Sequence, residues 1–126
     1  MDITPTYGLT HMAICVSDLK RTLDFYQTIF DMTVMYHEEN MIQLTTPGCH
    51  DILVFERKSS PIQVHSGITH FGFRLRSPEG IDVILKKLES AGATIIDRGE
   101  FVPGSPYVFF KDPDGYTVEV WYELLP

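Results

Sequence analysis

The sequence predicts an α+β fold built from two copies of a βαβββ unit. The main observation is an internal repeat: Gly-Leu-Thr-His at 8–11 is repeated as Gly-Ile-Thr-His at 67–70. Each copy opens an apolar run that leads into a helical pattern, and shorter strand-like runs follow. We therefore expect a single domain over residues 1–126, with module one at 6–57, a polar linker at 58–66 and module two at 67–125.

Module one opens with an apolar strand over 9–16. Ser17 is placed to cap a helix, whose apolar positions keep a spacing near 3.6 residues; these are Leu19, Leu23, Tyr26 and Phe30. Three strand candidates follow at 33–37, 41–45 and 51–57, separated by polar and Pro-Gly turn signals.

Module two repeats this order. A strand is predicted over 68–75, and Ser77-Pro78 starts a helix with Ile81, Ile84, Leu85 and Leu88 on one face, which Gly92 ends. The remaining strands fall at 94–97, 107–111 and 116–123. The last two are joined by Asp-Pro-Asp-Gly at 112–115, a sequence typical of a tight turn that ends with positive φ.

The composition excludes several classes of function. Seventeen acidic residues against ten basic ones give a net charge of −7, so the chain lacks the positive field that nucleic acids require. The apolar runs are short and residues 1–5 resemble no signal segment, so we expect no membrane partner and a cytoplasmic location. Two cysteines in 126 residues agree with a reducing compartment.

Strand parity places three possible metal ligands on the faces turned away from the helices. Successive strand side chains alternate between faces, so three apolar rows should be buried: Met12, Ile14 and Val16; Phe71, Phe73 and Leu75; Val118, Val120 and Tyr122. The opposite faces then carry His11, His70 and Glu119.

Two imidazoles and one carboxylate suit a divalent ion such as Ni, Zn, Co, Fe or Mn, with positions left open for substrate. One carboxylate against a 2+ ion leaves net positive charge, which favours a substrate oxygen that is anionic. The alternative from the pattern alone is that each His is a hydrogen-bonded structural residue.

Three segments carry a resemblance to a known family. They are 8–11 with Ser17-Asp18-Leu19 and Phe25-Tyr26, then 67–71, and then 110–119 with its Asp-Pro-Asp-Gly turn four residues before Glu119. Together they resemble the vicinal oxygen chelate superfamily, which includes glyoxalase I, bleomycin resistance proteins, fosfomycin resistance enzymes and extradiol dioxygenases. The resemblance implies that the two modules form an open, cupped mixed sheet around one divalent metal ion, held by His11, His70 and Glu119.

Within this superfamily, we expect a glyoxalase I-like lyase or isomerase that acts on a small oxygenated metabolite. Glyoxalase I usually adds a fourth ligand on the last strand of its first module, a place that falls here on Val54 or, two residues on, on Glu56. Glu56 is therefore the candidate catalytic residue, although Val54 is the preferred alignment. The alternative for Glu56 is a solvated pair with Arg57 or Lys58.

Two other functions stay open. One is an extradiol-type dioxygenase, although Phe109 stands where those enzymes usually have a Tyr. The other is a bleomycin-resistance-like binding protein without turnover, although such relatives have generally lost the metal ligands that this sequence retains. Fosfomycin thiol transferases have a similar triad but usually continue further beyond the final Glu.

The open faces also carry candidate substrate-binding residues. Arg74 shares the face of His70 and could hold an anionic group, or it could form a salt bridge at the rim. Tyr107 and Phe109 share a face and, with Trp121, would line an aromatic wall or pack in the core. Superfamily members with two modules usually form homodimers, so we expect that His11 comes from one chain and His70 with Glu119 from the other.

Overall fold

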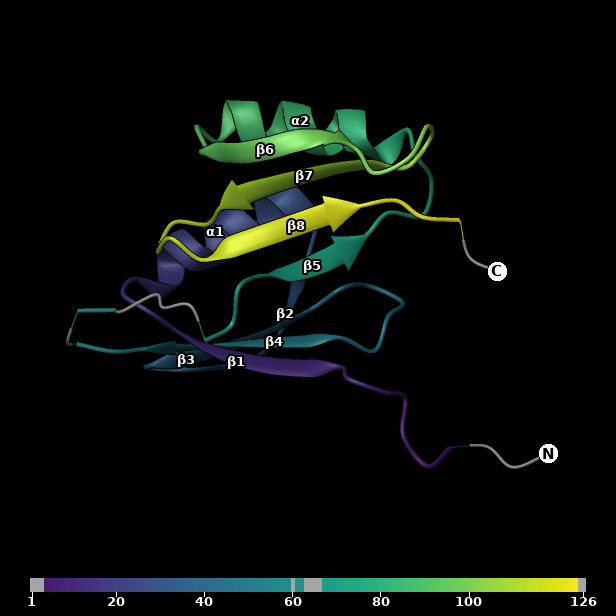
Figure 1. Ribbon diagram of the computed structural model, residues 1–126. Helices are drawn as coiled ribbons and strands as arrows, with labels where there is room; N and C mark the ends of the chain where they lie inside the picture. Colours follow the sequence, from purple (N-terminus) through teal and green to yellow (C-terminus); the bar gives the residue numbers. More distant parts are fainter. Residues whose placement is uncertain (1–3, 60, 63–66, 125–126) are drawn as a thin grey trace. The chain divides into compact units, whose positions relative to one another are not determined.

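The chain folds into two compact units, Met1–Ile62 and Gln63–Pro126. The computed structural model in Figure 1 describes residues 4–59, 61–62 and 67–124. The first unit contains β1 (His11–Val16), α1 (Leu19–Phe30), β2 (Thr33–Glu38), β3 (Met41–Thr45) and β4 (Ile52–Arg57). The second contains β5 (Phe71–Arg74), α2 (Gly80–Ser90), β6 (Ile95–Glu100), β7 (Pro106–Lys111) and β8 (Thr117–Trp121).

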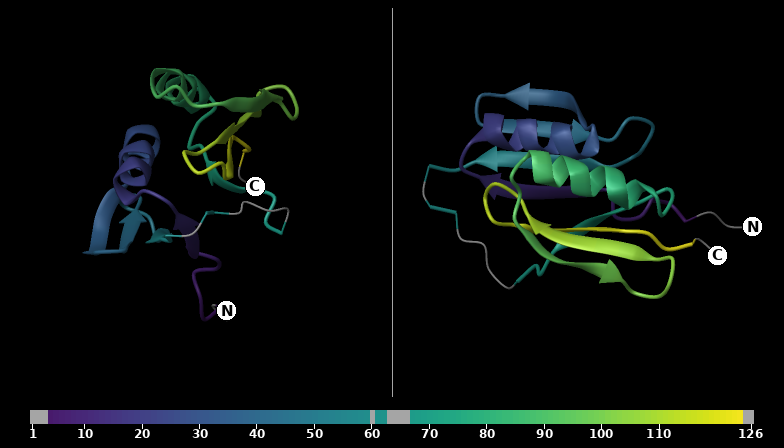
Figure 2. Two further views of the ribbon diagram at one scale, coloured as in Figure 1. Left: turned by 90° about the vertical axis from the view of Figure 1, so that its left-hand side faces the viewer. Right: turned by 90° about the horizontal axis from the view of Figure 1, so that it is seen from above.

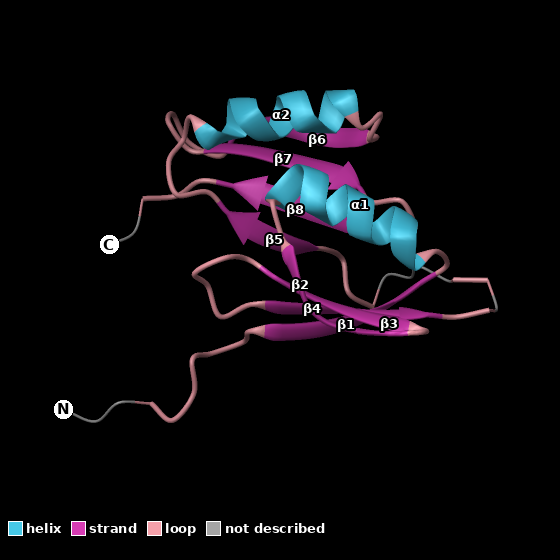
Figure 3. Cartoon of the chain, turned by 180° about the vertical axis from the view of Figure 1, so that it is seen from behind, coloured by secondary structure: helices cyan, strands magenta, loops and turns pink. Residues whose placement is uncertain are grey.

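Both units have the same sheet topology, which Figure 3 shows as magenta strands. The strand order is β1-β4-β3-β2 in the first sheet and β5-β8-β7-β6 in the second. In each sheet the first and last strands of the unit pair in parallel, and the other pairs are antiparallel. The predicted fold class is therefore confirmed: it is α+β, with two βαβββ units whose mixed sheets stay open.

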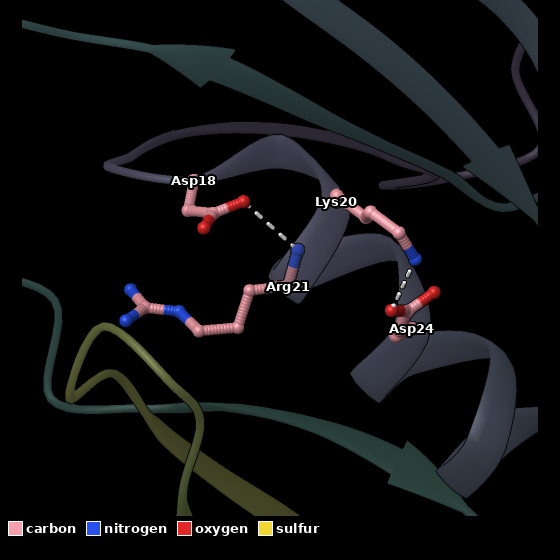
Figure 4. A network of polar contacts seen from close by, with 4 residues as sticks. All are labelled: Asp18, Lys20, Arg21 and Asp24. Atoms are coloured by element: carbon pink, nitrogen blue, oxygen red, sulfur yellow. Dashed lines mark hydrogen bonds and ion pairs between the residues drawn. The ribbon is translucent and has the colours of Figure 1, made fainter.

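Helix α1 begins one residue later than the capping prediction. The N-cap is Asp18 and not Ser17, because Asp18 is extended at φ −144° and its carboxylate accepts a hydrogen bond from the Arg21 amide at 3.0 Å. Figure 4 shows this cap beside the Lys20–Asp24 ion pair of the same helix, at 2.9 Å. The Ser17 hydroxyl accepts from the Arg21 guanidinium at 2.8 Å.

Helix α2 starts later than predicted and has no side-chain cap. Residues 77–79 form a turn, in which the Gly80 amide donates to the Ser77 carbonyl at 3.2 Å, and the N-cap Glu79 makes no capping hydrogen bond. The predicted end is correct: Gly92 lies at φ +69°, a conformation that glycine adopts without steric cost.

Several strand boundaries differ from the sequence prediction. The first strand begins at 11 instead of 9, and β5 covers only 71–74 of the predicted 68–75. Strand β6 continues to Glu100 instead of ending at Asp97, although residues 98–100 carry no apolar alternation. A β-bulge interrupts one edge strand of each sheet at the corresponding place, between Val34 and Tyr36 in β2 and between Ile95 and Asp97 in β6.

The predicted buried rows are confirmed only in part: the row of Phe71, Phe73 and Leu75 is half-buried, as are Met12 and Tyr122 at the ends of the other two rows. In β1, Ile14 and Val16 are buried, and in β8 Val118 and Val120 are fully buried, whereas their alternating neighbours are not. Each helix lies over one face of its own sheet, which both views in Figure 2 show. The face opposite the helix, called the open face below, carries the predicted site residues.

Among the described residues, no helix is long and apolar enough to cross a membrane. Within the predicted linker 58–66, Ser60 and residues 63–66 lie outside the described residues, as does Leu125 at the end of module two. The joining of both units into one domain stays a prediction.

Candidate functional site

The open face of the second unit is ordered by the pairing of its four strands. The pairing places Gly72, Glu119, Phe109 and Asp97 side by side across the sheet; we call this row the Glu119 rung. The next row on the same face, the Trp121 rung, consists of Arg74, Trp121, Tyr107 and Gly99. Phe109 therefore shares the rung of Glu119, and three further predicted site residues lie on the next rung: Arg74, Trp121 and Tyr107.

His70 lies directly before β5 and faces Glu119. Its Nε2 is 3.3 Å from the Glu119 Oε1, while the Thr69 hydroxyl lies 3.1 Å from the other ring nitrogen, Nδ1. The Glu119 side chain is only 14% exposed and that of His70 is 38% exposed.

This pair fits a divalent metal ion. One imidazole nitrogen and one carboxylate oxygen converge on the same point, which is the donor chemistry that borderline divalent ions prefer. A hydrogen-bonding partner on the second ring nitrogen is also typical of metal-ligating histidines, because it fixes the ring's orientation.

Gly72 makes room for this arrangement. A Cβ atom at this position would lie 2.9 Å from the Glu119 carbonyl oxygen, 2.9 Å from Trp121 Cζ3 and 3.3 Å from the Glu119 Cβ. Real Cβ atoms are not found this close to backbone oxygen or ring carbon. Glycine at 72 therefore allows the Glu119 backbone and the Trp121 ring to lie close against β5.

An aromatic row runs from His70 across the open face. The Phe109 ring meets the His70 ring edge-on at a centroid distance of 5.1 Å, Tyr107 lies 5.7 Å from Phe109, and Phe101 lies 4.2 Å from Tyr107. The Tyr107 hydroxyl donates to Asp97 Oδ2 at 3.0 Å, and this hydrogen bond raises the pKa of Tyr107 above its ordinary value. Tyr107 is therefore held in its neutral form.

Arg74 lies on the same face but is engaged locally. Its Nη2 donates to the Glu123 carbonyl at 2.7 Å and lies 3.8 Å from the Glu123 carboxylate. This arrangement matches the rim salt bridge that the sequence left open for Arg74.

In the first unit, His11 is the first residue of β1 and is exposed. The pairing of Ala13 with Val54 corresponds to that of Gly72 with Glu119, because each His lies two residues before the first member of its pair. Val54 therefore occupies the position in the first unit that Glu119 occupies in the second.

Glu56 lies one rung further along, opposite Cys15, and corresponds to Trp121. Its side chain is 46% exposed, and its carboxylate lies 3.8 Å from Lys58 Nζ. The register thus agrees with the preferred alignment of Val54 at the fourth ligand position.

The structure brings His70 and Glu119 together, while His11 belongs to the other unit. Within either unit, the described part of the chain contains no three His, Cys, Asp or Glu side chains grouped to hold a metal ion. Sequence reasoning did not assign Thr69, Gly72 or Asp97 to the site. Two signals were available in the sequence. The internal repeat contains Thr-His in both copies, and Asp97 has the same strand parity as Tyr107.

The family model of the Glyoxalase/Bleomycin resistance protein/Dioxygenase superfamily matches residues 8–120, which include all three predicted ligands. The chain belongs to this superfamily. A superfamily relative, the uncharacterized protein PA2024 of Pseudomonas aeruginosa, is 31% identical over 95% of this chain and 90% of its own length. The glutathione transferase FosA of Serratia marcescens is 30% identical over 90% of this chain and 79% of its own length.

Solved structures of the superfamily have the same fold. The fosfomycin resistance protein FosX of Listeria monocytogenes, solved with Mn(II) and sulfate, superposes with a TM-score of 0.78 at 21% identity, over 95% of this chain and 93% of that one. Two longer superfamily relatives are 25% identical: the catechol-2,3-dioxygenase of Bacillus subtilis and the lactoylglutathione lyase GLX1 of Arabidopsis thaliana. The matches span 44% and 42% of these two proteins.

Proposed function

We propose that this chain is a divalent-metal-dependent enzyme of the superfamily that acts on a small oxygenated metabolite. His11, His70 and Glu119 are its metal ligands, and the ion is Ni, Zn, Co, Fe or Mn. The observation that carries the proposal is the convergence of His70 Nε2 and Glu119 Oε1, 3.3 Å apart, on the open face of the second unit.

The bound ion would act as a Lewis acid toward substrate oxygens. The chain's own residues prepare the site for this chemistry. Thr69 orients the His70 ring through Nδ1, and Gly72 leaves space for the Glu119 backbone. Because the Glu119 side chain is only 14% exposed, water screens its charge less than that of a surface carboxylate.

The first reaction class is that of a glyoxalase I-like lyase or isomerase. The lactoylglutathione lyase relative supports this class. Glu56 is then the candidate base, since it shares the strand face of Val54 and its exposed carboxylate is accessible. We expect Glu56→Gln to lower kcat for a hemithioacetal of methylglyoxal by at least about 100-fold, the order that general bases contribute, with metal content unchanged.

The second reaction class is the addition of a thiol to an electrophilic carbon of the substrate. Val54 supports it, because an apolar side chain at the fourth ligand position leaves one more place on the ion open for substrate. The relatives named as thiol transferases also support it. In this class Glu56→Gln would change kcat by less than about twofold, so the same variant separates the two reactions.

A dioxygenase and a binding protein without turnover are weaker candidates. Phe109 on the Glu119 rung has no hydroxyl to assist ring cleavage. A binding protein has no need of converging metal ligands such as His70 and Glu119.

Metal content of the purified protein tests the proposal. Elemental analysis of protein prepared without chelators or an affinity tag should give one ion per subunit, and none in the His70→Ala, Glu119→Ala double variant. A matched control is His37→Ala, which alters an exposed imidazole on the edge strand β2. If the wild type holds no ion after incubation with each of the five metals, the proposed function is wrong.

We also propose that the protein forms a homodimer, with His11 from one chain and His70 with Glu119 from the other, and that it acts in the cytoplasm. Mixing His11→Ala subunits with Glu119→Ala subunits tests the shared site. Heterodimers should then hold up to one ion per dimer, whereas each variant alone holds none. No recovery of metal in the mixture would contradict sharing between chains.

A further inference from the structure

The aromatic row beside His70 and Glu119 indicates which substrates the site prefers. We propose that Phe109 and Tyr107 form a subsite for a flat apolar group, above all an aromatic ring, carried by the oxygenated substrate. This inference rests on the proposed metal site and deepens it by naming the substrate class.

The position of the row supports this inference. Phe109 is the neighbour of Glu119 on its own rung, and its ring also touches the His70 ring at 5.1 Å. A substrate oxygen bound to an ion that His70 and Glu119 hold would therefore place the adjoining substrate carbons near Phe109. Tyr107 continues the surface at 5.7 Å, at an angle of 65° to Phe109.

The row is held in place and is partly open to a ligand. Phe109 and Tyr107 are half-buried, so each keeps part of its ring surface for contact. The hydrogen bond from the Tyr107 hydroxyl to Asp97 fixes that ring at its far end, and Phe101 packs against it at 4.2 Å. A preformed aromatic surface binds a flat apolar group with little loss of side-chain entropy.

Two cations of this face, Arg74 and Lys111, are engaged with groups outside the row. Arg74 bonds the Glu123 carbonyl and pairs with its carboxylate, and Lys111 donates to the Thr117 hydroxyl at 3.3 Å. Both lie off the Glu119 rung, in the rungs on either side of it. The surface next to the metal ligands is thus apolar and not arranged for a second anionic group.

The first unit lacks this feature. The positions that correspond to Phe109 and Tyr107 are Gln43 and Met41, which pair with Val54 and Glu56 as Phe109 and Tyr107 pair with Glu119 and Trp121. The aromatic row is therefore a property of the second unit and not a requirement of the shared fold.

Two chelating probes test the inference. Acetohydroxamate and benzohydroxamate offer the same pair of vicinal oxygens to a metal ion and differ in a methyl against a phenyl group. Trp121 is the single tryptophan of the chain and lies on the rung beside Glu119, so its fluorescence reports binding of either probe to the metal-loaded protein. We expect benzohydroxamate to bind with a Kd about tenfold lower, the size of a good aromatic contact.

Variants assign that preference to the row. Phe109→Ala should reduce the preference to less than about twofold while acetohydroxamate binding stays within about twofold of wild type. Tyr107→Phe keeps the ring and should retain the preference, and Phe109→Leu serves if Phe109→Ala fails to fold, as judged by circular dichroism.

Equal binding of the two probes, or a preference that survives Phe109→Ala, overturns the subsite and leaves the metal site standing. If neither probe binds a protein shown by elemental analysis to hold its ion, the open positions on the metal are wrong and the inference falls with them. Failure to hold any ion is instead the failure of the proposed function.

Discussion

The two units share one scaffold and differ in what their open faces carry. In both, a small residue lies two residues after a histidine and pairs with a residue of the parallel strand: Ala13 pairs with Val54, and Gly72 pairs with Glu119. The second unit thus brings together His70 and Glu119, two candidate metal ligands, whereas the first unit has His11 and an apolar side chain at Val54. The comparison shows that the backbone register is the same in both units and that single side chains determine which open face carries a His–Glu pair.

The cores differ in a complementary way. Phe55 on β4 corresponds to Val120 on β8, and Leu44 on β3 corresponds to Phe110 on β7, and all four are fully buried. The large aromatic side chain therefore lies on β4 in the first unit, and in the second unit it lies on β7, the neighbour of the corresponding strand β8. In the first unit it packs against Tyr26 of α1 at a centroid distance of 4.8 Å.

The largest expected effect breaks this core comparison. Phe55→Ala should lower the free energy of unfolding by about 3–5 kcal/mol, because it removes a fully buried ring and leaves a cavity beside Tyr26. Val120→Ala at the corresponding position should cost clearly less, since it removes only two methyl groups. Urea denaturation followed by circular dichroism measures both. Equal losses would show that the two positions do not play corresponding roles.

The next effect concerns the small residue beside each site. Gly72→Ala should cost about 1–3 kcal/mol of stability, because its Cβ would meet the Glu119 backbone and the Trp121 ring at 2.9 Å. It should also weaken metal binding and shift the Trp121 emission. Ala13→Gly at the corresponding position should cost roughly 0.5–1 kcal/mol through backbone entropy. Unchanged metal affinity in Gly72→Ala would argue that Glu119 is not a ligand.

A smaller effect compares the helix starts. Asp18→Ala should lower the free energy of unfolding by about 1 kcal/mol, because it removes the hydrogen bond to the Arg21 amide. Glu79→Ala should change it by less than about 0.5 kcal/mol, since Glu79 makes no capping bond. Thermal melts of the two variants beside wild type provide the measurement. A comparable loss in both would mean that Glu79 also stabilises its helix.

The smallest effect is a pH dependence that the two units share. Hydrogen bonds to Glu38 and to Asp97 raise the pKa values of Tyr36 and Tyr107. Because the folded pKa is raised, each bond contributes its stability below the ordinary tyrosine pKa and loses it as pH rises through the folded value. Absorbance titration at high pH should show Asp97→Asn lowering the pKa of Tyr107 and leaving that of Tyr36 in place. Glu38→Gln should do the reverse, and Tyr107→Phe identifies the affected signal.

Much of this fold follows from periodicity in the sequence. Strand parity placed the rows of Ile14 and of Val118 in the core because a two-residue period has only two faces. Strand β6 was predicted too short because Arg98, Gly99 and Glu100 pair through their backbone and show no apolar alternation. The predicted cap Ser17 is wrong by one residue, because Ser and Asp both cap helices and only the backbone conformation distinguishes them.

The candidate site was predicted in part, for a physical reason. Parity assigns His70 and Glu119 to the same face of one sheet, where His70 Nε2 lies 3.3 Å from Glu119 Oε1. Parity does not say which two faces meet, so the union of His11 with this pair rests on the family resemblance and stays a prediction.

The matching bulges in β2 and β6 have a consequence for behaviour at high concentration. An edge strand exposes a row of backbone donors and acceptors that can pair with another molecule and seed aggregation. The bulges at Val34 to Tyr36 and at Ile95 to Asp97 break the regular spacing of that row in both sheets. Each bulge sits among exposed apolar side chains, Met35 at 50% and Ile96 at 49% exposure. The same irregularity therefore opposes edge-to-edge pairing along β2 and β6, where exposed apolar side chains would favour it.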